Sequence, residues 1–215
     1  LKKLQDDIKP FSSDIAKKII ESESQNLIEN IFTSFSEKPI ANASVAQVHT
    51  ALLKNGERVA VKILKPNIQK QLFKDFIFFY WISKCLEIAF PSIKRLKLSK
   101  NVEVLSEVSL NELDLTLEAS AAEELSENFK DNPNYKVPKI YWELTSKKML
   151  VLEYIKGIRI DDINALKKAN HNIKKITEIG TEVFFLQVFR DGFFHGDMHP
   201  GNILINPKGV LVPID

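Results

Sequence analysis

The amino-acid sequence predicts a mixed α+β protein with a small sheet-bearing lobe and a helical lobe. Strand-like runs occur in pairs, and segments with helical periodicity separate the pairs. Strands and helices do not alternate one by one, so a doubly wound parallel sheet is excluded. The composition, 44% hydrophobic and 27% charged, is typical of a globular protein. The length of 215 residues is sufficient to bury a core in one large domain or in two small lobes.

The elements expected in the first half begin with helices over 1–35, where apolar residues recur at helical spacing. Two strand-like runs follow at 43–53 and 57–64, and the Asn-Gly pair between them is a strong hairpin signal. Residues 67–90 and about 100–129 are then expected to form two long helices.

In the second half, residues 135–144 and 147–155 are expected to form another strand pair, which Gly157 closes. Helical periodicity returns over about 172–190, and a last hairpin is expected at 202–215.

We therefore expect three parts: an N-terminal helical extension over 1–38, a sheet-bearing lobe with inserted helices over 39–155, and the start of a helical lobe over 156–215. A hinge near 154–160 would separate the two lobes. The first residues read as mid-helix and the last as an apolar strand tipped by Asp215. The chain is accordingly expected to be a fragment whose second lobe is truncated.

Composition excludes several classes of protein. The formal net charge of +2, with basic residues spread along the chain, does not suit a nucleic-acid-binding protein. Cys85 is the only cysteine, so neither a disulfide framework nor a cysteine-based zinc cluster is possible. The charged N-terminus lacks the apolar region of a signal peptide.

Residues 76–90 are very apolar, but Ser83, Lys84 and Glu87 interrupt them. The longest uncharged run is well short of the roughly 20 residues that a helix needs to cross a bilayer. We expect a mostly buried helix here, with a membrane-facing patch as the alternative, and a chain that is itself soluble.

Lys62 lies in the apolar run VAVKIL. A lysine inside such a strand is unfavourable unless its ammonium reaches water or a carboxylate. An edge strand with the ammonium in solvent would satisfy it. Alternatively, Lys62 could be the strand lysine of protein kinases, whose ammonium binds nucleotide phosphates. The V-A-I-K pattern of that strand is V-A-V-K here.

A glutamate on the following long helix positions the kinase lysine. Glu112, Asp114 and Glu118 are expected on one helix, and Asp114 and Glu118, four residues apart, would share a face of it. A solvated acidic face is the alternative interpretation of these three carboxylates.

The segment HGDMHPGN places Asp197 two residues after His195 and Asn202 five residues after Asp197. This is the spacing of the kinase catalytic loop H-R-D-x-x-x-x-N. There the aspartate accepts a proton from the attacking hydroxyl and the asparagine oxygen binds Mg²⁺. Asp215 ends an apolar strand thirteen residues after Asn202, where the metal-binding aspartate of the D-F-G motif belongs.

Two other interpretations of this loop are a transition-metal site formed by His195, Asp197 and His199, and a polar turn without function. The loop lacks an H-E-x-x-H pattern, and HPGN is typical of a turn. Phosphate transfer is favoured because four separate features follow one another in the same order as in protein kinases, each on the expected kind of element. They are Lys62, Glu118, Asp197 with Asn202, and Asp215.

No glycine-rich loop precedes Lys62. The corresponding stretch is PIANASVAQVHTA, with alanines and a serine in place of G-x-G-x-x-G. Alanine adopts positive φ less readily than glycine, so the loop is expected to be stiffer and to follow phosphates differently. A plain core strand is the alternative for this stretch.

With these motifs the chain resembles the UbiB/ADCK family of atypical protein-kinase-like proteins, and its bacterial members most of all. The resemblance runs through nearly the whole chain and includes LKKLQDD, ANASVAQVH, VAVKILKP, the ELD of an E-x-D motif, VPKIY and VFRDGFFHGDMHPGN. The alanine-rich loop and the E-x-D motif are specific to the family. The H-G-D loop is not, because small-molecule kinases of the aminoglycoside and homoserine type also use it.

The resemblance implies a bilobal kinase-like fold that binds ATP with Mg²⁺ and supports ubiquinone biosynthesis at the cytoplasmic face of a bacterial inner membrane. ATP hydrolysis coupled to the handling of isoprenoid lipid or of ubiquinone-biosynthesis proteins is the activity it favours. A nucleotide-binding pseudokinase scaffold and a small-molecule phosphotransferase are the alternatives. The family's K-x-G-Q helix would precede residue 1, and its membrane helices would follow Asp215.

By motif, the resemblance also implies a role for each site residue. Asp197 would be the catalytic aspartate, Lys62 the strand lysine, and Glu118 its partner on the helix. The remaining roles are nucleotide binding by Ala41, Ala43, Ser44, Glu153 and Ile155, metal binding by Asn202 and Asp215, and regulation by Glu112 and Asp114. Asn42 stands where many members have alanine, which implies a slightly different phosphate pose.

Overall fold

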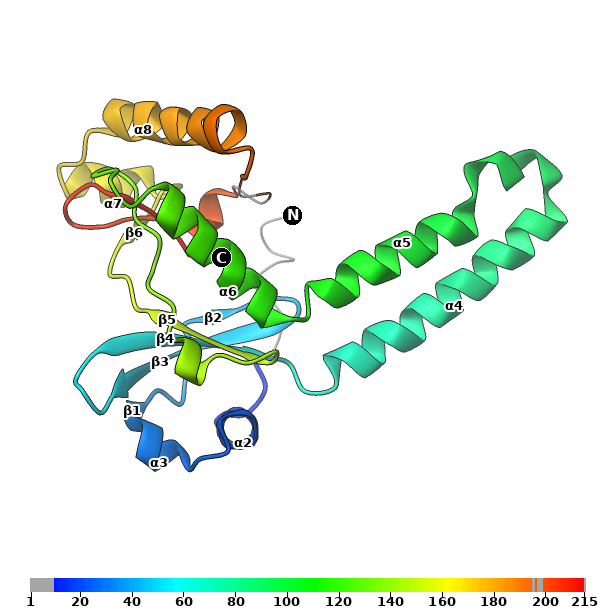
Figure 1. Cartoon of the computed structure of the whole chain (residues 1–215), viewed down its shortest axis with the longest axis horizontal. Helices are drawn as coiled ribbons and strands as arrows, with labels where there is room; N and C mark the ends of the chain where they lie inside the picture. Colours follow the sequence, from blue (N-terminus) through cyan, green and yellow to red (C-terminus); the bar gives the residue numbers. More distant parts are fainter. Residues whose placement is uncertain (1–9, 195, 197–198, 215) are drawn as a thin grey trace.

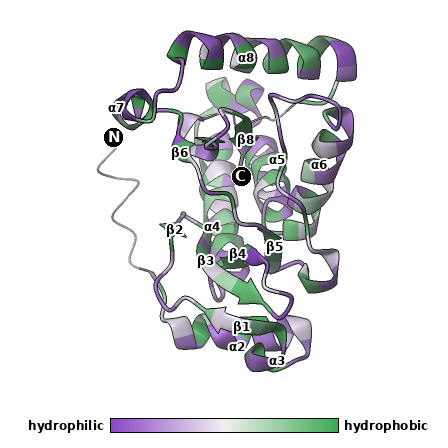
Figure 2. Ribbon diagram, turned by 90° about the vertical axis from the view of Figure 1, so that its left-hand side faces the viewer, coloured by the Kyte–Doolittle hydropathy of each residue, from purple (hydrophilic) through white to green (hydrophobic). Residues whose placement is uncertain are grey.

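The computed structural model describes residues 10–194, 196 and 199–214, and it confirms the α+β class. Two β-sheets organise the chain (Figure 1). In Figure 2 the smaller sheet lies between helix α8 (Ile173–Phe185) and the larger sheet.

The larger sheet has five antiparallel strands in the order β1-β3-β4-β5, with β2 paired to β3. The strands are β1 (Phe32–Phe35), β2 (Ala41–Asn42), β3 (Ala46–Leu53), β4 (Arg58–Leu64) and β5 (Met149–Glu153). The predicted β3–β4 hairpin is confirmed. Gly56 supplies the turn with φ +86°, and the Leu53 amide donates to the Glu57 carbonyl at 2.9 Å.

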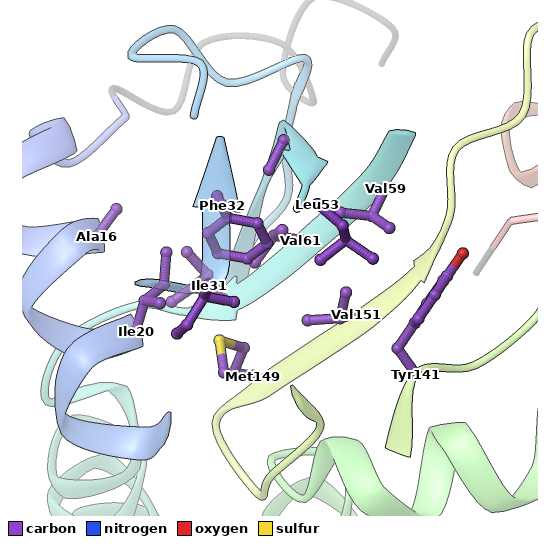
Figure 3. Packing of buried hydrophobic residues seen from close by; sticks show 12 residues of the cluster. Ala16, Ile20, Ile31, Phe32, Leu53, Val59, Val61, Tyr141, Met149 and Val151 are labelled. Atoms are coloured by element: carbon purple, nitrogen blue, oxygen red, sulfur yellow. The ribbon is translucent and has the colours of Figure 1, made fainter. Parts of the chain in front are cut away.

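Both faces of this sheet are covered. On one face α2 (Ser13–Ser24) and α3 (Ile28–Ile31) pack against apolar side chains of β4 and β5, including Val61 and Val151 (Figure 3). On the other face Ala60 and Leu150 contact α6 (Leu115–Asn128). Since β-strand side chains alternate between faces, Lys62 points to the α6 side, as Ala60 does.

A long helical hairpin is inserted between β4 and α6. It consists of α4 (Ile68–Ala89), a 3₁₀ turn (Pro91–Leu96) and α5 (Leu98–Asn111), and it projects away from both sheets (Figure 1). Within the described residues, no helix has the length and apolar content needed to cross a membrane.

The smaller sheet has the strand order β6-β7-β8, and a core of its own lies under α8. Gly157, in the linker before β6, comes so close to β7 that an added Cβ would lie 2.9 Å from the Ile205 carbonyl oxygen. The elements of this part are β6 (Ile158–Arg159), α7 (Ile163–Lys168), α8 (Ile173–Phe185), a π-helix (Leu186–Asp191), a 3₁₀ turn (Pro200–Asn202), β7 (Ile203–Ile205) and β8 (Leu211–Pro213).

Three expected elements were wrong. Residues 32–35 form β1 rather than helix, because pairing with β3 overrides the local helical pattern. The helix expected over 100–129 is two helices, broken at 112–114. Residues 135–144 are not a strand: they carry single bridges at Tyr135 and Ile140 and a 3₁₀ turn at Trp142–Leu144.

The expectation of a buried helix over 76–90 was also wrong. Phe78, Phe79, Trp81 and Ile88 are between 53% and 80% exposed, because α4 packs along α5 rather than against a sheet. Apolar composition alone does not tell a buried helix from one that projects from the molecule.

Gln47 and His49 form a buried polar pair in β3. His49 Nδ1 lies 2.8 Å from the Ser36 carbonyl oxygen, and His49 Nε2 lies 2.6 Å from Gln47 Nε2. Because a carbonyl only accepts, Nδ1 carries the proton and Nε2 accepts from the Gln47 amide, which describes a neutral ring. Burial lowers the pKa of His49, and the bond to Ser36 opposes that shift in part.

This lowered pKa predicts a loss of stability in mild acid. The unfolded ring, with a pKa of about 6.5, takes up its proton at a higher pH than the folded ring. The free energy of unfolding should therefore fall as the pH drops below about 6.5, by at most about 1.4 kcal/mol per pH unit. Thermal melts at a series of pH values would measure this. His49→Gln should lack the slope, and equal slopes in both proteins would contradict the assignment.

Candidate functional site

Lys62 and Glu118 join the larger sheet to α6. Lys62 Nζ donates to Glu118 Oε1 at 2.8 Å and to Oε2 at 2.9 Å, and the two side chains are 12% and 30% exposed. Lys62 lies in β4, which β3 and β5 flank on both sides, so it is not an edge-strand lysine. A charge-assisted pair of this geometry fixes the ammonium where the sheet and the helix meet.

Apolar packing on each side of this pair holds the two elements in place. Ala60 and Leu150 of the sheet share one buried cluster with Leu115 and Ala119 of α6. Ala119 directly follows Glu118 and is fully buried, which fixes the helix rotation that aims Glu118 at the strand.

The E-x-D motif lies at the break between α5 and α6 rather than within one helix. Asp114 is the N-cap of α6: its Oδ1 accepts from the Thr116 amide at 3.1 Å, and its Oδ2 lies 3.3 Å from Lys147 Nζ. The hydrogen bond from the Thr116 hydroxyl is the main cause that lowers the pKa of Asp114. Glu112 is exposed at the C-cap of α5, and Leu113 between the two acids is buried.

The capping role gives a testable separation of functions. Asp114→Ala should lower the free energy of unfolding by about 1 kcal/mol, because α6 loses its N-cap. Asp114→Asn keeps a capping oxygen and should lose less stability, although it removes the charge facing Lys147. Denaturant unfolding of both variants checks this. Equal losses would mean that the charge, and not the cap, stabilises the helix start.

Lys147 is a residue that sequence reasoning missed. It contacts Asp114 through its side chain, and its carbonyl accepts from the Leu115 amide at 3.0 Å. Neither contact has a local sequence signal, because the two segments lie more than 30 residues apart.

An apolar cavity with about 800 Å³ of empty space, part of it open to solvent, adjoins the ion pair between the two sheets. Among the described residues that line it, Glu118 is the only charged one. The other lining side chains come from α6, from β5 and the segment before it, and from Phe193, Phe194, Pro213 and Ile214. The cavity therefore connects the lysine–glutamate pair with the loop that precedes His195.

The alanine-rich segment forms a tight turn beside the site. Ala41 pairs with Val48 of β3, which in turn pairs with Lys62, so one strand separates the turn from the lysine. The Ala43 amide donates to the Ala46 carbonyl at 2.8 Å and closes the turn, and Ala43 and Ser44 are exposed. Small side chains leave the backbone of this turn open to an approaching ligand.

Glu153 and Ile155 lie where β5 leaves the sheet and the chain enters the linker to the second part. The Glu153 amide donates to the Lys139 carbonyl at 2.8 Å, and the Glu153 carboxylate pairs with Lys136 at 2.5 Å. The Glu153 carboxylate is thus engaged by Lys136, and the predicted nucleotide role of Glu153 and Ile155 stays a prediction.

Asn202 ends the 3₁₀ turn before β7. Its amide donates to the His199 carbonyl at 2.8 Å, and its carbonyl accepts from the Ile214 amide at 2.9 Å. This second bond places the residue that precedes Asp215 beside Asn202. Asp215 itself, together with His195 and Asp197, lies outside the described residues, so their predicted roles stay predictions.

The alternative metal site through His195, Asp197 and His199 has one described member. His199 Nδ1 accepts from the Gly201 amide at 3.0 Å, which is a turn-capping bond. Across the described part of the chain, no cluster of three histidine, cysteine or acidic side chains is suited to hold a metal ion.

A central-strand lysine paired with a helix glutamate, in a chain whose β7–β8 hairpin follows an H-G-D-x-x-x-x-N sequence, is the arrangement of a kinase-like protein. The chain belongs to the family described as ABC1 atypical kinase-like domains, whose model matches residues 3–215.

Among curated proteins, it is 45% identical over 213 residues to "Probable protein kinase UbiB" of Marinobacter nauticus, covering 99% of this chain and 39% of that protein. It is 42% identical over 205 residues to the protein of the same name from Aliivibrio fischeri, covering 95% of this chain and 38% of the relative. The chain therefore spans about two fifths of the length of these relatives.

Among solved structures, Rv3197 of Mycobacterium tuberculosis, determined in complex with erythromycin, matches with a TM-score of 0.77 and 27% identity. That match covers 96% of this chain and 51% of the other. It supports the predicted kinase-like fold over nearly all of the chain.

Proposed function

We propose that this chain is the nucleotide-binding core of an atypical kinase or ATPase that binds ATP with Mg²⁺ and supports ubiquinone biosynthesis at a bacterial inner membrane. The observation that carries the proposal is the ion pair between Lys62 and Glu118. It holds the ammonium of Lys62, whose side chain is 12% exposed, against Glu118, which lines an apolar cavity between the two sheets.

The described residues fit a nucleotide. Lys62 Nζ would bind phosphate oxygens while Glu118 holds it in place, and the open backbone of Ala41, Ala43 and Ser44 would lie over the phosphates. The linker backbone at Glu153 and Ile155 would contact the base.

The side chains of Asn202 and Asp215 would suit Mg²⁺, which prefers amide and carboxylate oxygens. Asn202 would supply an amide oxygen and Asp215 a carboxylate, and the bond from the Ile214 amide to the Asn202 carbonyl places the residue before Asp215 beside Asn202. When bound, the ion would neutralise charge on the phosphates. Asp197 would accept the proton of the attacking hydroxyl or water.

Two kinds of relation support the ubiquinone role and the membrane location. The chain is 40–45% identical to proteins named UbiB, and its motifs resemble that family. Isoprenoid lipid or ubiquinone-biosynthesis proteins would then be its partners.

The experiment that tests the nucleotide site is a melting-temperature shift with Mg-ATP and with Mg-ADP. A chain extended past Asp215 should be used, because a terminal Asp215 would carry a second carboxylate. Ligand at a hundredfold excess over Kd stabilises the folded state by about 2.7 kcal/mol. The shift should require Mg²⁺ and disappear in Asp215→Asn.

If neither nucleotide shifts the melting temperature, the nucleotide site is wrong. The second outcome concerns the biosynthetic role. If the shift occurs but the unmutated full-length protein does not complement a ubiquinone-deficient strain, only that role is wrong.

A further inference from the structure

The α4–α5 hairpin, residues 68–111, exposes much of the apolar surface of the molecule. It holds twelve of the 22 exposed large hydrophobic side chains among the described residues, although only 44 of those residues belong to it. Surface of this kind marks an interaction site when it is contiguous. Along α4, Ile77, Trp81 and Ile88 follow at i, i+4 and i+11, so they share one exposed stripe.

Packing against α5 does not cover this stripe. The less exposed α4 positions are 68, 72, 76, 80, 82, 83 and 87; all but 82 recur every three or four residues, as expected for the seam with α5. The exposed stripe lies beside that seam. Helices that are apolar on several sides are usually buried in a core or in contact with a membrane.

The charge of the hairpin is concentrated at its distal end. The tip, defined here as residues 84–100, contains five basic residues and one acid, for a net charge of +4. The rest of the hairpin, 68–83 with 101–111, contains two lysines and three acids, for a net charge of −1. The basic residues of the tip are Lys84, Lys94, Arg95, Lys97 and Lys100.

The single acid of the tip is already engaged. Glu87 Oε1 accepts from the Ser99 amide at 3.0 Å, and Oε2 accepts from the Ser99 hydroxyl at 3.0 Å. The backbone bond from Ser99 lowers the pKa of Glu87. This contact ties α4 to the start of α5, so the tip is a fixed structure that presents basic and apolar side chains together.

We propose, resting on the membrane location of the proposed function, that the tip of the α4–α5 hairpin docks on the surface of a bilayer that contains anionic phospholipid. Ile88 and Phe90 of the tip, together with Trp81 just before it in α4, would enter the headgroup region, where tryptophan and other apolar side chains are favoured beside basic residues. The lysines and arginine would lie against the lipid phosphates.

A second copy of the chain fits the tip less well than lipid does. In a two-fold symmetric pair the same patch faces itself. Two tips with a net charge of +4 each would therefore repel one another. An anionic surface satisfies the apolar and the charged side chains at the same time.

Two variants test this surface, each with a matched control elsewhere on the molecule. Ile88→Ser/Phe90→Ser removes apolar side chains that are 80% and 55% exposed, and Phe189→Ser, at a site 78% exposed, is its control. Lys94→Gln/Arg95→Gln removes two charges from the tip. Its control is Lys167→Gln/Lys168→Gln, an exposed basic pair in α7.

The measurement is sedimentation of the 215-residue chain with phosphatidylglycerol–phosphatidylcholine vesicles and with pure phosphatidylcholine vesicles. The chain should bind the anionic vesicles, and added salt should weaken the binding. The charge variant should lose about fivefold in partition coefficient per basic residue, or about 25-fold in all. The apolar variant should lose at least about tenfold. Both controls should bind as the parent does.

The proposal would be overturned if the chain did not bind anionic vesicles, or if both tip variants bound them as tightly as the parent does. It would also be overturned by a dimer in lipid-free solution that Ile88→Ser/Phe90→Ser dissociates, because a second copy would then cover the tip. Melting-temperature shifts with Mg-ATP, measured on the same variants in a chain extended past Asp215, keep the two proposals apart. If Mg-ATP shifts the melting temperature but the chain does not bind the vesicles, the docking surface alone is wrong. If the parent chain binds the vesicles but Mg-ATP does not shift its melting temperature, the nucleotide site alone is wrong.

Discussion

Asp197→Asn is expected to reduce turnover of Mg-ATP by about 10²- to 10⁴-fold, which is the usual contribution of a positioned general base. Asparagine has nearly the shape of aspartate but cannot accept a proton. The variant should therefore retain its nucleotide-dependent melting shift while the rate of ADP formation falls. Single-turnover and steady-state assays at saturating nucleotide would measure this rate.

The exposed Asp131 provides a matched control, since Asp131→Asn makes the same chemical change at a residue outside the HGDMHPGN segment. It should leave both readouts unchanged. If Asp197→Asn forms ADP at the parental rate, Asp197 is not the catalytic base. If the parent forms no ADP although nucleotide shifts its melting temperature, the chain is a nucleotide-binding scaffold.

Local patterns in the sequence predicted the β3–β4 hairpin and α4 closely, because each depends on neighbouring residues. Asn-Gly specifies its turn through the positive φ of Gly56. Helix α4 follows from a long apolar and charged run without proline. The final hairpin, β7 with β8, is confirmed for the same reason, with Gly209 at φ +81° in its turn.

The wrong expectations depend on distant contacts. Strand β1 forms because β3 offers it a partner, although its own residues continue a helical pattern. The break between α5 and α6 depends on Asp114, which favours the N-cap position over a helix interior and which Lys147 contacts from far along the chain. A sequence pattern could have suggested the cap, because Asp114 precedes the apolar–polar run of α6.

The exposure of α4 could not be predicted from its composition. Burial depends on what lies beside a helix, and α4 has α5 on one side only. By contrast, the ordered motifs around Lys62 and Glu118 predicted a spatial pair across 56 residues of sequence. That was possible because the two motifs were interpreted by analogy with a known arrangement, and not from local propensity.

Lys62→Ala is expected to weaken Mg-ATP binding by about 10- to 150-fold, because the phosphates lose a charge-assisted hydrogen bond worth roughly 1.5–3 kcal/mol. The loss of stability without ligand should be small, since Glu118 is 30% exposed and water can solvate its carboxylate. Calorimetric titration with nucleotide, alongside thermal melts of the ligand-free proteins, would separate the two effects. Lys54→Ala, an exposed lysine near the β3–β4 turn, is the control.

Glu118→Gln shows whether the pair acts as a unit. Glutamine keeps the side-chain length but no longer holds the ammonium by charge, so binding should weaken less than in Lys62→Ala. In the double variant, Glu118→Gln should add little to the loss caused by Lys62→Ala, because the glutamate would act only through the lysine. Additive losses would mean that Glu118 contacts the ligand separately. Unchanged affinity in Lys62→Ala would leave Lys62 and Glu118 as a structural tie between β4 and α6.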